Sequence, residues 1–390
     1  MTRQSLQEYA AAIRPRYARA TRAQKGQLLD EFCRNTDLHR KAAIRLLHHV
    51  PTPKQERTGR PRLYDAQLAP HLVRLWDVCD RPCSKLLVAA LPILVDSLER
   101  HKELRLDPEH RRQILSLSPA TIDRLLQPTR DRIGRQPHRR GSSSTSTLKK
   151  QIPLRTFGEW KDVTPGSLQG DLVLHCGETV AGFYLTTLTA VDVATSWTEL
   201  EVVWGLGLQR VRGAVCHVRS RLPFSLREWH VDNGAEFLNR LLVGWCRNEG
   251  IRMTRGRGYR KNDQAYVEQR NWLAVRRLVG YDRYCSRAAF LTLQRLYALY
   301  RLQLNFLRPA RKLIAKHRTG SRVIKRYDRA QTPYQRLVAS GVLSSAERSA
   351  MEAVLSDINP VTLNREIQAT LQKLWNLRES HELHTTARRR

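Results

Sequence analysis

Three acidic residues in the second half of the chain lie where ordinary surface charges are not expected. Asp171 is inside the strand-like stretch LQGDLVL, Asp232 follows the apolar approach in REWHVDNG, and Glu268 lies in AYVEQR, on a predicted helix. A carboxylate at the C-terminal end of a strand, directly before a turn, is in the place where α/β folds usually put chemistry. These three acids are therefore the candidates for a catalytic site.

Carboxylates that are brought together raise one another's pKa values unless a cation neutralises them. Hard divalent ions such as Mg²⁺ or Mn²⁺ prefer oxygen ligands. Two such ions about 4 Å apart can activate an attacking oxygen and stabilise the leaving oxygen at a phosphodiester. If Asp171, Asp232 and Glu268 converge, they predict a site for two Mg²⁺ or Mn²⁺ ions and metal-assisted phosphodiester chemistry.

Plainer explanations exist for several of the acids. Asp232 could simply close an Asx-turn with its own side chain, as Asp and Asn commonly do. Asp192 lies in another strand-like stretch, and we expect it to cap the turn at Thr195-Ser196. We expect Glu236 to complement a helix N-terminus and Asp263 to belong to the start of the next helix. None of these last three is expected to bind metal.

The charge of the chain indicates a polyanionic partner. In 390 residues there are 68 Lys and Arg against 36 Asp and Glu, a formal net charge of +32. Double-stranded DNA is the expected partner for so basic a protein, although an arginine-rich proteome could also produce this composition. A membrane-surface role is disfavoured because no long basic amphipathic helix with an aromatic face stands out.

The cysteine pattern and the N-terminal residues indicate the cellular compartment of the protein. The seven cysteines form no framework, and Cys79-x3-Cys83 lacks the second pair that a zinc module needs. The first residues contain no apolar signal region, and no stretch is apolar enough to span a membrane. These features predict a cytoplasmic protein with reduced thiols.

Residues 1–50 have the pattern of a helix-turn-helix DNA-binding domain. Thr21-Arg-Ala-Gln24 spells a capping box, and a second helix from Leu38 to Leu47 carries Arg40, Lys41 and Arg45 away from its apolar stripe. That placement is typical of a helix that reads DNA. We therefore predict that these three residues bind DNA, although many helical hairpins share the pattern.

Four further regions are predicted from composition and periodicity. Residues 51–64 form a linker in which Arg60 and Arg62 suit either an arm in a minor groove or a plain connection. Residues 65–127 form a second helical, helix-turn-helix-like DNA-binding domain, with a strong helix start at Ser118-Pro119. Residues 128–150 are a basic Ser/Thr-rich linker. Residues 286–390 form a mainly helical C-terminal region.

Residues 151–285 alternate strands and helices. Strands are predicted at 168–176, 183–193, 197–203, 227–232 and 251–254, with helices at 209–222, 235–248 and 263–279. This order predicts an α/β domain built on a mixed sheet. In the loop before the last helix, glycines allow close approach of the backbone to DNA, and the side chains predicted to bind DNA are Arg255, Arg257, Arg260, Lys261 and Asn262.

The acids and the motifs around them resemble the DDE integrase and transposase superfamily. The motifs are the Asp…Asp-(35)-Glu spacing, VDNGAEFLN and KNDQAYVEQRNWLAVRRLVGYDRY. The nearest likeness is to prokaryotic insertion-sequence transposases, whose N-terminal part is similar to FCRNTDLHRKAAIRLL, GRPRLYDAQL, CSKLLVAALPIL and SPATIDRLL. The resemblance implies a ribonuclease-H-like catalytic core, a mixed five-stranded sheet with helices.

The resemblance also assigns roles to residues. It makes Asp171, Asp232 and Glu268 the metal ligands, places Asn233 and Gly234 in the turn after the second aspartate, and makes Asn262 the residue that opens the glutamate helix. One position departs from the family. Where many relatives carry a basic residue after the glutamate, this chain has Trp272 and Val275, and Arg270 and Arg276 lie on other faces.

The function that follows is a DNA transposase or integrase. It would bind element ends and join a 3′-hydroxyl to a target phosphodiester, acting as a homo-oligomer on DNA and associating with the prokaryotic nucleoid. The alternatives are a non-catalytic, sequence-specific DNA-binding regulator derived from a transposase and a ribonuclease H-type nuclease.

Overall fold

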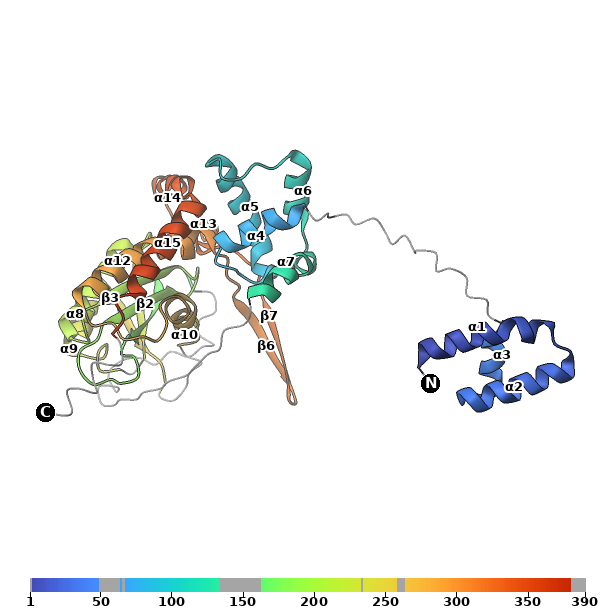
Figure 1. The fold of residues 1–390 in the computed structure, drawn as a ribbon. Coiled ribbons are helices and arrows are strands. Elements are labelled where there is room, and N and C mark those ends of the chain that lie inside the picture. The colour runs from blue at the N-terminus through green and yellow to red at the C-terminus, as the bar shows by residue number, and fades with distance from the viewer. Residues whose placement is uncertain are drawn as a thin grey trace. The chain divides into compact units, whose positions relative to one another are not determined.

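The computed structural model describes residues 2–48, 64, 67–133, 163–232, 234–257 and 264–379 (Figure 1). The chain divides into two compact units, Met1–Leu63 and Tyr64–Arg390. No helix in the described part of the chain is long and apolar enough to cross a membrane.

The first unit is a bundle of three helices, α1 (Arg3–Arg19), α2 (Arg22–Thr36) and α3 (Arg40–His48). Its core contains Tyr17, Phe32 and Leu47. The predicted capping box at Thr21 is confirmed, with the Thr21 amide donating to Gln24 Oε1 at 2.9 Å. Asp37 ends α2 in the left-handed conformation, with φ of 59°. Helix α1, which completes this core, was not predicted from the sequence.

The second unit begins with four helices that share a core of their own. They are α4 (Leu68–Val78), α5 (Ser84–Arg100), α6 (Pro108–Ser116) and α7 (Pro119–Ile133). The predicted start of α7 is confirmed, because the Thr121 amide donates to Ser118 Oγ at 3.2 Å. The helix then continues through Pro128 to Ile133, so the start of the predicted linker is helical, and the rest of that linker lies outside the described residues.

The predicted mixed sheet is confirmed. Its strands are β1 (Ser167–Leu174), β2 (Thr186–Asp192), β3 (Thr198–Val203), β4 (Glu228–Val231) and β5 (Arg252–Arg255). The spatial order is β3-β2-β1-β4-β5. The first three strands pair antiparallel, whereas β4 and β5 run parallel to β1 and to each other.

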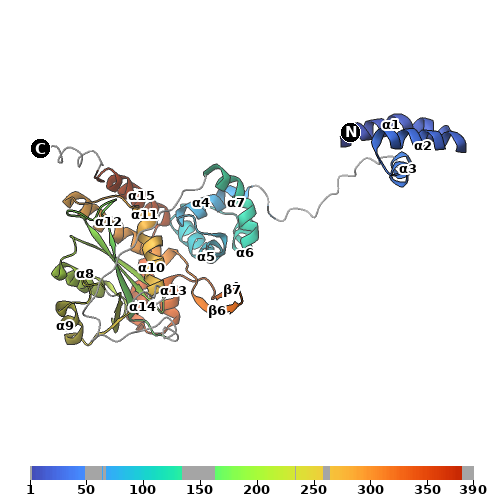
Figure 2. The same cartoon turned by 90° about the horizontal axis from the view of Figure 1, so that it is seen from below.

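Two sets of helices cover the two faces of this sheet (Figure 2). On one face, α8 (Leu208–Arg221) and α9 (Arg240–Asn248) pack against Leu168, Trp229 and Val231. On the other face, Val173 packs among side chains that follow residue 270. The chain there forms α10 (Ala265–Arg270), the π-helix η4 (Asn271–Arg276), α11 (Arg277–Val279) and α12 (Arg287–Leu302).

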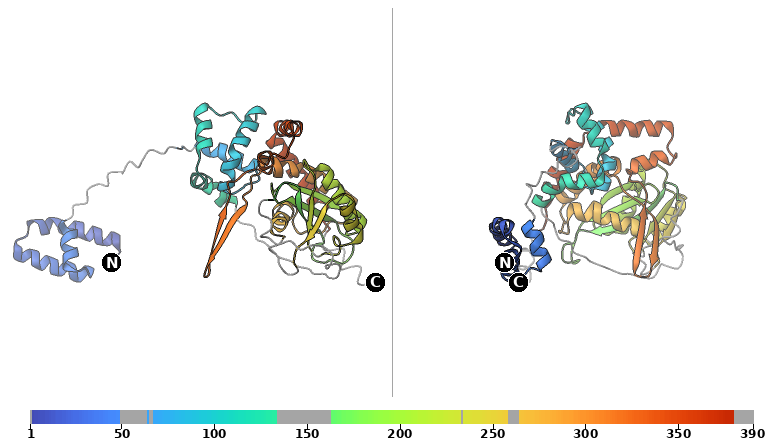
Figure 3. Two further views of the ribbon diagram at one scale, coloured as in Figure 1. Left: turned by 180° about the vertical axis from the view of Figure 1, so that it is seen from behind. Right: turned by 90° about the vertical axis from the view of Figure 1, so that its right-hand side faces the viewer.

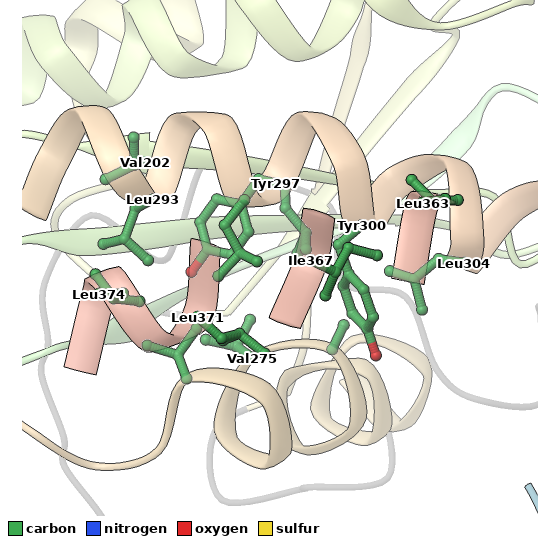
Figure 4. Close-up of a cluster of buried hydrophobic side chains, with 14 of the residues drawn as sticks. Val202, Val275, Leu293, Tyr297, Tyr300, Leu304, Leu363, Ile367, Leu371 and Leu374 are labelled. Carbon is green, nitrogen blue, oxygen red and sulfur yellow. The ribbon is translucent and has the colours of Figure 1, made fainter. Parts of the chain in front are cut away.

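The C-terminal region completes the second face instead of forming a separate core. After a π-helical turn, η5 (Gln303–Leu307), come α13 (Pro333–Ala339), α14 (Ser345–Asp357) and α15 (Pro360–Trp375). Figure 4 shows Ile367 and Leu371 of α15 packed with Tyr297 of α12 and with Val275. The boundary predicted at residue 285 therefore divides one continuous core.

One part of the C-terminal region corrects the sequence analysis. Residues predicted to be helical or irregular form an antiparallel hairpin, β6 (Leu313–Thr319) and β7 (Arg322–Tyr327), separate from the main sheet. Every residue of β7 is exposed. A strand that is solvated on both faces shows no apolar alternation, and the periodicity of the sequence therefore gave no signal.

Candidate active site

The strand register places Asp171 and Asp232 side by side. Gly170 of β1 is opposite Val231 of the parallel strand β4, and each of these residues is followed directly by an aspartate. Neighbouring strands are about 4.8 Å apart. Side chains alternate between the faces, so Asp171 points away from Leu168 and Asp232 points away from Val231, toward the face that α10 covers.

Asp171 is held by two hydrogen bonds. The Leu172 amide donates to Oδ1 at 2.8 Å, and Asn271 Nδ2 donates to Oδ2 at 2.6 Å. Burial raises the pKa of Asp171 to about 7, and the negative charge of Asp232 contributes to the increase. The two hydrogen bonds oppose this increase, and Glu268 adds a smaller repulsion. Desolvation and the neighbouring carboxylates therefore both favour the protonated form of Asp171.

Asp232 forms the Asx-turn that was the alternative to a metal-binding role. The Gly234 amide donates to Asp232 Oδ1 at 2.9 Å, which is an Asx-turn. A Cβ added at Gly234 would lie 2.9 Å from that same oxygen and 2.5 Å from Glu236 Oε1. A carboxylate has two oxygens, so the turn does not exclude a second role. Asn233 lies outside the described residues.

Glu268 lies on α10, which is fastened to β1 beside Asp171. The Val267 amide donates to Gln169 Oε1 at 3.2 Å, and Asn271, three residues after Glu268, makes the bond to Asp171. From Asn271 the backbone is π-helical. Single π turns inside helices occur frequently at functional sites. Glu268 itself is exposed.

The donor set fits a hard divalent cation in its chemistry. It consists of carboxylate oxygens that repel one another, and a cation would relieve the repulsion that raises the pKa of Asp171. In the described ranges, however, no three His, Cys, Asp or Glu side chains are close enough together to hold a metal ion. The two aspartates are adjacent through the sheet, and Glu268 is not gathered with them as a third ligand.

The position of Glu236 differs from the one expected from the sequence. It does not lie at a helix N-terminus, because α9 begins at Arg240, where Asn239 caps the helix by accepting from the Leu242 amide at 3.0 Å. Glu236 is instead in the turn after Asp232. Burial, opposed by a hydrogen bond to its own backbone and assisted by the charge of Asp232, raises the pKa of Glu236. A fourth carboxylate is thus close to the site.

The other acids follow the sequence analysis where they are described. Asp192 is fully buried and caps the predicted turn, accepting from the Thr195 amide at 2.8 Å and from the Thr195 hydroxyl at 2.6 Å. Asp263 lies outside the described residues. Gln169 and Asn271 were not predicted as site residues, although Asn271 is one helical turn from Glu268 and so on the same side of the helix.

The cations near the glutamate helix have other partners. Buried Arg270 donates to the Ser196 carbonyl at 3.2 Å, and Arg276 donates to the Leu174 carbonyl at 3.0 Å. Both guanidinium groups are therefore engaged with backbone carbonyls. Val275 is buried, whereas the side chain of Trp272 is 40% exposed.

The predicted DNA-binding residues are only partly within the described structure. Arg40 of α3 forms an ion pair with Asp30 of α2, while Lys41 and Arg45 are exposed. At the end of β5, Arg255 is half-buried and Arg257 is exposed. The remaining predicted residues lie outside the described ranges: Arg60, Arg62, Arg260, Lys261 and Asn262.

Comparison with solved structures finds retroviral integrase cores at low similarity. The catalytic core domain of BIV integrase is 17% identical, with a TM-score of 0.27, over 45% of this chain and 95% of that chain. The HTLV-2 integrase catalytic core domain in complex with magnesium is 18% identical, with a TM-score of 0.25, over 30% of this chain and 71% of that chain. TM-scores this low assign neither a fold nor an activity to this chain.

Sequence comparison gives a firmer relationship. No family model matches the chain. The uncharacterized protein y4rM of Sinorhizobium fredii (strain NBRC 101917 / NGR234) is 42% identical over 333 residues, which are 84% of this chain and 94% of y4rM. This level of identity over nearly the whole relative is that of homologues with one fold. The chain belongs to the same protein family as y4rM.

Proposed function

We propose that the chain is a DNA transposase or integrase with a ribonuclease-H-like core, related to those of prokaryotic insertion sequences. The observation that carries the proposal is the pair Asp171 and Asp232, adjacent on parallel strands and facing the helix that bears Glu268. A basic chain of +32 supplies the affinity for a polyanion.

In this proposal Asp171, Asp232 and Glu268 hold Mg²⁺ or Mn²⁺, which would stabilise charge on the attacking and leaving oxygens. Asn271 orients Asp171 through its amide, and the Gly234 amide orients Asp232. The 3′-hydroxyl of one strand attacks a target phosphodiester, so one P–O bond forms as another breaks. No nucleoside triphosphate is needed, because the phosphodiester bond that forms is equivalent in energy to the one that breaks.

We further propose that the first unit recognises element ends. Lys41 and Arg45 are exposed on α3, while Arg40 is paired with Asp30, whose carboxylate would compete with a phosphate for the guanidinium. Helices α4–α7 would form a second DNA-binding part, and the active species would be a homo-oligomer on DNA.

A non-catalytic DNA-binding regulator is the second candidate. The observation that favours it is that the described acids include no group of three that could hold a metal ion. The two candidates differ in a single measurable property, which is the joining of DNA strands in the presence of Mg²⁺.

The test is a strand-transfer assay with end-labelled DNA from the flanks of the element. We expect the Asp232→Asn protein to lose cleavage and joining but to keep duplex binding, because phosphate affinity comes from Lys and Arg. Asp357→Asn is the matched control, since Asp357 is an exposed acid at the end of α14. Wild-type protein that binds the ends but never joins them would support the regulator instead.

A further inference from the structure

The hairpin β6–β7 is an unusual surface element. Figures 1 and 3 show it as a two-stranded ribbon that extends away from the helices of its own unit. Its strands pair from Leu313 opposite Tyr327 to Thr319 opposite Arg322. A two-stranded hairpin without further strands or a covering helix is marginally stable in water. We therefore expect this exposed hairpin to bind a partner.

The composition of the hairpin indicates the charge of that partner. Between Leu313 and Tyr327 the chain contains no Asp or Glu. The exposed basic residues of β7 are Arg322, Lys325 and Arg326. Side chains alternate along a strand, so Arg322 and Arg326 lie on one face and Lys325 lies on the other. Both faces of the ribbon therefore carry positive charge.

The base of the hairpin is held firmly, in contrast to its exposed strands. Asp328 accepts from the Lys312 amide at 2.6 Å and forms an ion pair with Arg336 at 2.5 Å. Arg336 also donates to the Ala310 carbonyl at 2.9 Å. Ala310 and Gln331 close the base as a β-bridge. The hairpin is thus fixed in direction by its base.

This base adjoins the elements of the candidate active site. Lys312 Nζ donates to the Ala194 carbonyl at 2.8 Å, in the turn whose Ser196 carbonyl accepts from Arg270 of α10. Tyr266 of α10 is close enough to Asp328 for the charge of that aspartate to contribute, after burial, to raising the pKa of Tyr266. The turn after β2 therefore holds both the hairpin and the helix that carries Glu268.

We propose that the β6–β7 hairpin is a DNA-binding arm that enters a groove of the duplex presented to the candidate active site. The major groove is about 12 Å wide and admits a two-stranded β-ribbon. Positive side chains on both faces suit a ribbon flanked by two phosphate backbones, whereas a ribbon lying flat on one surface would need them on one face only. The contacts are to phosphates and do not depend on sequence.

The identity of the polyanion as DNA rests on the proposed function. A second copy of the chain, added edge to edge, is disfavoured because two ribbons of the same positive charge would repel each other. Duplex RNA is a separate possibility, and its deep, narrow major groove does not admit side chains. Both are outcomes of the test below.

The test compares two pairs of substitutions in the full-length protein. Arg322→Ala/Arg326→Ala removes two charges from the hairpin, and Arg365→Ala/Lys373→Ala removes two from exposed positions of α15. Binding of a labelled DNA duplex of mixed sequence is measured by fluorescence anisotropy in EDTA, across salt from about 50 to 200 mM. EDTA prevents catalysis, so the result does not depend on the activity of the acids.

We expect the hairpin pair to reduce the slope of log affinity against log salt by about 2, roughly one for each lost phosphate contact. The α15 pair should keep the wild-type slope. Arg322→Lys/Arg326→Lys should also keep it, because the charge remains. All four side chains are exposed, so thermal unfolding should be unchanged. If the Ala pair nevertheless melts early, Lys325→Gln gives the same comparison with an expected change of about 1.

Several results would contradict the proposal that the hairpin is a DNA-binding arm. They are equal slopes for wild type and the hairpin pair, an equal loss in the α15 pair, or a loss confined to duplex RNA. A change of oligomeric state in sedimentation without a change in DNA affinity would make the hairpin an interface between copies. Wild-type protein that binds no duplex at all would refute the proposed function together with the arm, whereas binding with unchanged slopes refutes the arm alone.

Discussion

Asn271 is the residue through which the glutamate helix reaches Asp171. Its Nδ2 donates to Asp171, while its Oδ1 is buried without a hydrogen-bond partner in the described structure. That uncompensated oxygen carries a free-energy cost. The side chain is therefore placed for its contact with the aspartate and not for the stability of the helix.

We expect Asn271→Ala to weaken strand transfer and Mg²⁺ affinity by about 10- to 100-fold, as is usual when a residue that orients a metal ligand is lost. Mg²⁺ affinity is measured by thermal shift, separately from activity. Gln269→Ala, at an exposed neighbouring position of α10, is the control. Unchanged Mg²⁺ affinity in Asn271→Ala would show that the contact has no orienting role.

His175 gives a prediction about pH. It is fully buried beyond the end of β1, with Nε2 2.7 Å from Thr187 Oγ1, and burial lowers its pKa to about 3. The folded protein keeps this imidazole neutral, while the unfolded chain takes up a proton below pH about 6.5. The contribution of His175 to stability is therefore complete above that pH and is lost as the pH falls toward 3.

From this group alone, the free energy of unfolding should fall by about 1.4 kcal/mol per pH unit between pH 6 and 4. The His175→Gln protein should show a shallower fall over the same range. Urea denaturation at several pH values measures both proteins, and their difference isolates the histidine from other titrating groups. Parallel curves would mean that His175 becomes charged in the folded state.

At the scale of elements, the contact between β1 and β4 sets the distance between the two aspartates. A Cβ added at Gly170 would lie 2.8 Å from Cη2 of the Trp229 indole and still closer to its Cζ2. Trp229 is fully buried and belongs to the core beneath α8 and α9. The ring cannot move aside, so an added methyl group must shift one strand against the other.

We expect Gly170→Ala to destabilise the protein by about 1–3 kcal/mol, the usual cost of overpacking, and to reduce strand transfer by more than the folded fraction explains. Gly213→Ala in α8 is the control, because nothing lies within 4 Å of its added Cβ. That change should stabilise by about 0.5–1 kcal/mol. Chemical denaturation measures the stability of both variants. The specific activity of the folded protein shows whether Gly170→Ala loses strand transfer beyond the loss of folded protein.

The elements differ in how well the sequence predicts them. Strands β1–β5 and helix α8 were predicted to within a few residues, because apolar side chains recur along each of them. The π turn at Asn271 and the start of α9 were not, since a π turn has no sequence signature and the cap at Asn239 follows a run that also suits a helix. The side-by-side position of Asp171 and Asp232 depends on strand register, which spacing along the chain does not give.

At the scale of the whole molecule, helices α4–α7 are joined to the rest of their unit through polar contacts. Asp80 forms ion pairs with Arg308 and Arg277, and Ser97 Oγ donates to the Ile358 carbonyl at 2.8 Å. A fragment that ends near residue 150 would leave these groups without partners. The first unit has a core of its own.

We therefore expect a fragment of residues 1–63 to unfold cooperatively, with the modest stability of a small domain, and to bind element ends with sequence preference. Residues 64–390 should bind duplex DNA without preference. Circular dichroism during heating and competition binding with element and unrelated DNA measure these properties. Discrimination of the ends by residues 64–390 alone would reverse the roles of the two units.

The packing of α15 against α12 has a consequence for the order in which a newly made chain acquires its parts. Domains generally fold as units as they emerge during synthesis, N-terminal units first. The three-helix unit is complete once His48 has been made, whereas the core behind the glutamate helix lacks Leu371 and Leu374 until the last described helix is finished. A message cut short before α15 would therefore encode a chain with an intact first unit and an unfinished second one.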